Sequence, residues 1–204
     1  MKKKTFVMIL ALVLVLGLAV GGTIAYLTSS TDEVVNTFTI GKVEIDLYEH
    51  PLKVDADGKT DGKTIDTTKD PVKAVEGYQM MPGRELQKDP TVEVKTGSED
   101  CWVFVKVTEA NNALTSDATK KYINWTVDTA NWEVVDADNN VYGSKVVKSA
   151  GDTVAVLTDD KVTVSQEVTS ADTATPTLTF IAYAVQAEGF DTAAAAWAAT
   201  FGAN

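Results

Sequence analysis

The chain has 204 residues and carries 18 Lys and Arg against 29 Asp and Glu, a net charge of −11 at pH 7. Such a charge repels phosphate backbones, so nucleic acid is excluded as a partner class. Cys101 is the single cysteine, which excludes an intramolecular disulfide and leaves stability to packing. Because Cys101 opens an apolar alternating segment, we expect a buried, unreactive thiol.

The first residues have the pattern of an export signal. Three lysines at positions 2–4 precede an unbroken apolar run from Phe6 to Val20, and small residues follow. This pattern predicts a signal peptide over residues 1–25, cut between Ala25 and Tyr26, and therefore a secreted protein. The alternative is an uncleaved anchor, because residues 6–25 are about long enough to span a bilayer core of ~30 Å.

Residues 26–39 come directly after the predicted cut and mix apolar with polar side chains. We expect this segment to be an extended N-terminal arm, able to add a strand to the exposed sheet edge of another copy. The apolar residues expected to make that contact are Tyr26, Leu27, Val34, Val35 and Phe38.

Short segments with a period of two follow along residues 40–204. They are rich in Val, Ile, Thr and aromatic residues and are separated by Gly, Pro, Asn and Asp, which is typical of strands and turns. The spacing predicts an all-β fold, an antiparallel jelly-roll-like β-sandwich. The predicted strands are 43–48, 91–95, 101–109, 122–127, 131–136, 141–148, 153–157, 161–165 and 177–187.

Two of these segments are apolar on both faces. In 101–109 the alternating residues from Cys101 and those from Trp102 are both hydrophobic at the start, which favours a central strand. The segment 178–185 is similar, so we expect these two strands at the heart of the core.

A polar stretch near 54–70 is crowded with Asp, Gly, Lys and Thr, and we expect an exposed loop that does not pack. Its acidic spacing from Asp55 partly matches a calcium loop. Lys59 stands where a ligand is needed and Asp66 replaces the closing Glu, so a solvated loop is preferred and calcium is the lesser alternative.

A short helix is predicted near the C-terminus. Asp191 is the expected N-cap, and Gly202 is expected to end the helix. Trp197 and Phe201 are four residues apart, so both side chains are expected to face the sandwich.

No catalytic, cofactor or metal residues are predicted, so the chain is not expected to be an enzyme. His50 is the only histidine, and the pattern His-Glu-x-x-His of many zinc proteases does not occur. A lone histidine beside Pro51 is best interpreted as an exposed turn residue.

Several stretches resemble one family of secreted bacterial proteins, the TasA/camelysin family. Its members are exported by Gram-positive bacteria through a SipW-type signal peptidase. The resemblance implies a jelly roll; some members form biofilm matrix fibres, and others are described as surface metalloproteases. The stretches that carry it are 21–28, 36–43, 81–83, 88–90, 102–107 and 184–187.

We therefore expect a structural subunit of an extracellular matrix or cell-surface fibre that assembles by strand donation. Its expected partners are further copies of itself, other matrix or accessory proteins, and the signal peptidase during export. One alternative is a monomeric cell-surface binding module, in which the arm packs on its own domain. A camelysin-type metalloprotease is the least favoured alternative, because no protease motif carries over.

Overall fold

The computed structural model describes residues 41–202, which form antiparallel sheets and one short C-terminal helix. The all-β prediction is confirmed, while its jelly-roll topology stays a prediction. The strands are β1 (Ile45–Tyr48), β2 (Leu52–Val54), β3 (Thr60–Ile65), β4 (Glu85–Gln87), β5 (Thr91–Val94), β6 (Cys101–Ala110), β7 (Ile123–Asn124), β8 (Trp132–Asp136), β9 (Val141–Ser144), β10 (Thr153–Ala155), β11 (Lys161–Val164) and β12 (Thr177–Gln186), and the helix is α2 (Ala193–Thr200).

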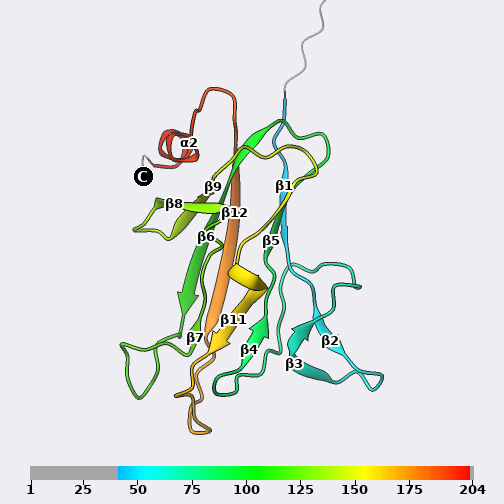
Figure 1. The fold of residues 1–204 in the computed structure, drawn as a ribbon, viewed down its shortest axis with the longest axis vertical. Coiled ribbons are helices and arrows are strands. Elements are labelled where there is room, and N and C mark those ends of the chain that lie inside the picture. Colours follow the sequence, from blue (N-terminus) through cyan, green and yellow to red (C-terminus); the bar gives the residue numbers. More distant parts are fainter. Residues whose placement is uncertain (1–40, 203–204) are drawn as a thin grey trace, which may run out of the picture. The chain divides into compact units, whose positions relative to one another are not determined.

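All strands except β2 and β3, which pair only with each other, make two layers (Figure 1). One layer joins the sheet β1-β5-β10 to the sheet β4-β11-β7, because β4 continues into β5 and β10 continues through a short 3-10 turn into β11. The other layer has the order β12-β6-β9-β8. Each of the nine predicted strand segments overlaps one of these strands, whereas β2, β3 and β4 were not predicted.

Strand β6 is central, as predicted, and buries both faces. Cys101, Val103, Val105 and Val107 point into the core between the two layers, together with Val92 and Val94 of β5 and Trp132 of β8. On its other face, Trp102 and Phe104 pack against α2. The strand therefore needs an apolar partner on each side, and the helix supplies the second one.

The expectation of a central position for 178–185 is wrong in one respect. Both faces of β12 are partly covered, by the core at Phe180 and by α2 at Tyr183 and Val185. However, within the described residues β12 pairs with β6 alone and is the edge of its sheet. Burial of both faces therefore does not require strands on both edges.

Helix α2 is capped by Thr192 and not by the predicted Asp191. The Ala195 N–H donates to Thr192 Oγ1 at 3.1 Å, which satisfies one of the free donors of the first turn. Trp197 is buried and Phe201 half-buried, with ring centroids 4.6 Å apart, so the predicted pair does face the sheet.

The polar stretch near 54–70 is partly ordered as a β-hairpin, β2–β3, and not wholly a loop. Gly62 allows close packing against Gln79: the glycine is buried, and its carbonyl accepts from the Gln79 N–H at 2.8 Å. The Ile65 N–H donates to Gln87 Oε1 at 3.0 Å. The hairpin is thus attached to β4 and to the segment before it.

Gly143, in the middle of β9, provides a test of the contact between α2 and the sheet. A Cβ atom there would lie 2.8 Å from Ala193 Cβ and 2.9 Å from Val135 Cγ1. We expect Gly143→Ala to push α2 outward and lower the free energy of unfolding by about 1–3 kcal/mol, measured by urea denaturation. Val134→Ala, at a residue 58% exposed, is the control and should change it by less than about 0.5 kcal/mol. Equal stability of G143A and wild type would contradict this packing.

Candidate functional site

The free edge of β12 is the first part of the candidate site. The Ala187 N–H donates to the Asp100 carbonyl at 2.8 Å, and the register continues residue by residue along β6. In an antiparallel ladder every second residue forms backbone hydrogen bonds with the partner strand. The backbone N–H and C=O groups of the residues between them therefore point away from β6. Within residues 41–202 none of these outward N–H and C=O groups has a hydrogen-bond partner. They belong to Leu178, Phe180, Ala182 and Ala184.

An apolar groove lies beside the first half of β12. It consists of two adjoining cavities of ≈ 600 and ≈ 190 Å³, both lined by Val75, Lys88 and Leu178. The larger cavity continues between β4, β7 and β11, and the smaller one reaches Leu47 of β1. A strand that paired with β12 would therefore place alternate side chains against apolar surface.

The buried ammonium of Lys88 lies at the junction of the two cavities. Its Nζ is 2.8 Å from Glu49 Oε1, and these side chains are only 12% and 9% exposed. The same Nζ lies 5.3 Å from the Tyr78 ring centroid and 5.6 Å from that of Phe180. The Glu49 carboxylate and the faces of the two rings together stabilise the Lys88 ammonium, which would be costly to bury alone.

The Tyr78 hydroxyl is a polar group of this groove that lacks a partner within the described residues, although the oxygen is buried. Burial raises the pKa of Tyr78 well above its ordinary value, and the nearby Glu49 and Asp89 carboxylates add to the effect. The hydroxyl therefore stays protonated. It can donate a hydrogen bond to a carbonyl brought into the groove.

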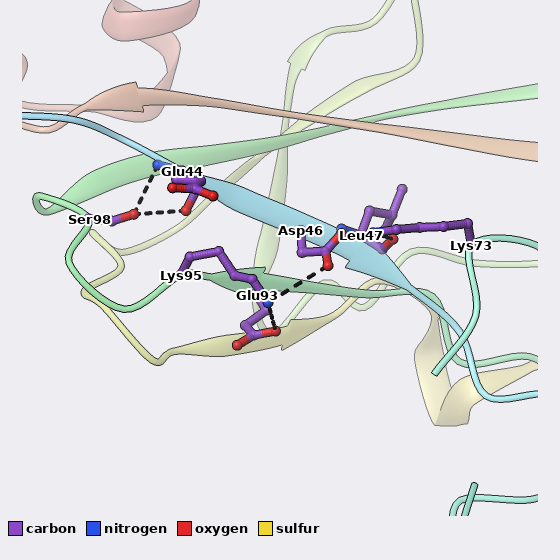
Figure 2. Close-up of polar contacts among 7 residues, drawn as sticks. All are labelled: Glu44, Asp46, Leu47, Lys73, Glu93, Lys95 and Ser98. Carbon is purple, nitrogen blue, oxygen red and sulfur yellow. Dashed lines mark hydrogen bonds and ion pairs between the residues drawn. The ribbon is translucent and has the colours of Figure 1, made fainter. Parts of the chain in front are cut away.

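Strand β1 borders the same open side, but its edge is partly blocked (Figure 2). The Leu47 N–H donates to Asp46 Oδ1 at 2.8 Å, and the Leu47 carbonyl accepts from Lys73 Nζ at 3.3 Å. Lys73 also pairs with Asp46. A charged side chain over an edge discourages strand addition, so of these two edges β12 is the more open.

Charged and polar contacts also fix the position of β1 on its other side. Figure 2 shows Ser98 bonded twice to the Glu44 backbone, at 2.9 Å to its N–H and 2.8 Å to its carbonyl. Lys95 pairs with Glu93 at 2.9 Å and with Asp46 at 3.7 Å. β1 is therefore held against β5 and forms a fixed wall of the groove.

The site residues predicted from sequence lie outside the described residues. This applies to the cleavage pair Ala25 and Tyr26 and to the arm residues, so their predicted roles stay predictions. The apolar arm residues are Tyr26, Leu27, Val34, Val35 and Phe38.

His50 is not the exposed turn residue that was expected. Its Nδ1 lies 2.6 Å from Asp89 Oδ2, its backbone N–H donates to Asp89 Oδ1 at 3.0 Å, and its side chain is 20% exposed. The pair joins the end of β1 to the β4–β5 connection. The two residues are 39 positions apart, so no local pattern could have indicated the contact.

Asp55 and Asp61 of the β2–β3 hairpin accept hydrogen bonds from nearby backbone N–H groups. Asp55 Oδ1 accepts from the backbone of Asp57 and Lys59, and Asp61 accepts from Lys63 and Thr64. Bonds from the Thr64 hydroxyl and then from the two backbone groups lower the pKa of Asp61 to about 2. Among residues 41–202 no three His, Cys, Asp or Glu side chains gather as metal ligands would.

Comparison with known proteins adds no assignment: the chain matches no family model, no curated protein and no solved structure. Within residues 41–202 no helix is both long and apolar enough to cross a membrane.

Cys101 provides a test of how tightly the core is closed. The residue is fully buried, and burial, reinforced by Asp100 and Asp152, raises the pKa of its thiol to about 11. Because the thiolate is the reactive form, we expect no reaction with Ellman's reagent at pH 8 in the folded protein. Full reaction of one thiol should follow unfolding in guanidinium. Rapid labelling under native conditions would mean that the start of β6 opens readily.

Proposed function

We propose that this chain is a secreted structural subunit of an extracellular matrix or surface fibre, in which the arm of one copy, residues 26–39, pairs with β12 of the next. The observation that supports the proposal is the free edge of β12, with four residues whose outward backbone groups lack partners within the described residues. Exposed edges of this kind accept extended segments through main-chain hydrogen bonds.

The dimensions and the groove are consistent with this pairing. Strand β12 has ten residues and the arm 14, which at ~3.3 Å per residue extend about 33 and 46 Å. Val34 and Phe38 would lie on one face of an extended arm and could enter the apolar groove. The Tyr78 hydroxyl offers a donor for one arm carbonyl.

Such a contact would be heterologous, because the donating and accepting surfaces differ. Contacts of this type do not close on themselves unless the rotation happens to form a ring, so they generate open filaments. The high negative charge keeps single subunits soluble until specific pairing overcomes their repulsion. This reading agrees with the fibre-forming role implied by the TasA/camelysin resemblance.

Removal of the donor is the first test. We expect deletion of residues 26–35 from the mature protein to abolish filaments in electron microscopy while the domain keeps its circular dichroism spectrum and unfolding transition. The undeleted mature protein is the control. Normal polymers from the truncated protein would show that strand donation by this arm is wrong.

Blocking the acceptor edge is the second test. Proline lacks an N–H but is tolerated on an edge strand where the N–H faces outward, so Ala182→Pro should stop filament growth without preventing pairing of β12 with β6. Val134→Pro, on β8 at the opposite edge of the same sheet, is the matched control and should leave filaments intact. If A182P is folded and still polymerises, β12 is not the acceptor.

Mixing experiments separate donor from acceptor defects. The A182P protein keeps its arm and should cap growing wild-type filaments, whereas the 26–35 deletion keeps its acceptor edge and should bind an added arm peptide of residues 26–39. Failure of that peptide to bind the truncated protein would argue against the proposed contact directly.

A further inference from the structure

A second groove begins one strand away from β12, between the ends of β6 and β9 in one layer and the chain around β7 in the other. It has a volume of ≈ 520 Å³, which is within the usual range for small-molecule sites. Its lining residues come from three places: the end of β6 with Glu109, the start of β9 with Asn140 and Tyr142, and the chain on either side of β7, including Lys121 and Trp125. In one layer β11 lies between β7 and β4, and in the other β6 lies between β9 and β12.

Two aromatic rings line this groove. Trp125 and Tyr142 are each half-buried, and among the described residues neither packs against another aromatic ring. The Trp125 ring is fixed in place because its Nε1 donates to Glu109 Oε1. A rigid ring that lines a groove offers a flat apolar surface at little entropic cost.

Glu109 is the ordered polar centre of the groove. Its Oε1 also accepts from Lys121 Nζ at 2.7 Å, and its Oε2 accepts from Asn112 Nδ2 at 3.0 Å. Burial opposes ionisation, but the bonds from Lys121, Asn112 and Trp125 outweigh it and hold the pKa of Glu109 below its ordinary value. The carboxylate is therefore ionised, and its charge is offset by the Lys121 ammonium. Three donors occupy three of its roughly four acceptor positions, so one position remains for a ligand.

Uncharged polar groups surround this centre. The side chains of Thr126, Thr129, Asn140 and Tyr142 make no hydrogen bond within residues 41–202, although all four line the groove. Their hydroxyl and amide groups can both donate and accept. A ligand with many hydroxyls and an apolar ring face satisfies both features of the groove. An anionic ligand would be repelled by the net charge of −11.

We propose that this groove binds a neutral oligosaccharide, with a pyranose ring against Trp125 or Tyr142 and its hydroxyls bonded to Glu109, Lys121 and Asn140. The inference does not rest on the fibre proposal, since the residues that line this groove differ from those of β12 and of the groove beside it. A chain that polymerised through β12 would keep this groove exposed.

The test is isothermal titration of the mature protein with three neutral probes: cellohexaose, chitohexaose and mannohexaose. The main variant is a double mutant that carries both Asn140→Gly and Thr129→Val. Both residues are exposed, and glycine readily adopts the positive φ of 52° found at Asn140. We expect at least one probe to bind wild type and to bind this variant at least about tenfold more weakly.

Asn139→Gly is the matched control. This amide belongs to the same turn but bonds to Asp136 outside the groove, so its loss should leave binding unchanged. Tyr142→Leu tests the ring separately, after its unfolding transition has been checked, and should also weaken binding about tenfold. The proposal is overturned if no probe binds wild type at millimolar concentration. It is equally overturned if the N140G/T129V protein binds as wild type does.

The 26–35 deletion separates this proposal from the fibre proposal. We expect the truncated protein to bind the same probe with the same affinity, because no residue that lines this groove belongs to β12 or lines the groove beside it. Loss of filaments with unchanged binding would support two independent surfaces. Binding that disappeared with the deletion would contradict the separate groove proposed here.

Discussion

Burial of both faces of β6 is the constraint on which the rest of the structure depends. All ten residues of this strand pair with β12 on one side, and Phe104, Val105 and Lys106 pair with β9 on the other. Its inner valines close the core between the layers, while Trp102 and Phe104 would be exposed without α2. The helix is thus a consequence of the strand. Its alanines, Ala193 and Ala196, allow the close approach that bulky residues would prevent.

The same arrangement leaves the two edges at the open side unequal. β1 is four residues long and has Lys73 over its Leu47 carbonyl, whereas the ten residues of β12 carry no such charge on the outward backbone. Proteins commonly blunt exposed edges with short strands or lysines. A long edge without such a device, beside an apolar groove, is the kind of surface that a partner strand completes.

The sequence allowed much of the fold to be predicted because period-two alternation reports which faces of a strand are buried. It identified nine strands and the position of β6. It missed β2 and β4, which have three residues each, and β3, whose TDGKTI sequence has the composition of a loop. The predicted N-cap of α2 was one residue too early, because Asp191 and Thr192 are both good N-cap residues.

The candidate sites were far less predictable. Alternation says nothing about which edge of a strand is paired, so the free edge of β12 had no sequence signal. The Lys88–Glu49 and His50–Asp89 contacts each join residues 39 positions apart. The second groove combines the ends of β6, β7 and β9, and its rings could equally have been core residues. Sequence patterns give the elements, but such sites come from how the elements pack.

The two proposed surfaces have a physical consequence when they are combined. A groove that binds a single oligosaccharide segment makes few contacts, so its affinity alone would be modest. A filament built through β12 would repeat the groove once per subunit, and a long polysaccharide could then engage several grooves. Each further contact is intramolecular and is favoured by the effective concentration along the filament. Polymerisation would thereby convert a weak site into a strong attachment without any change in the groove itself.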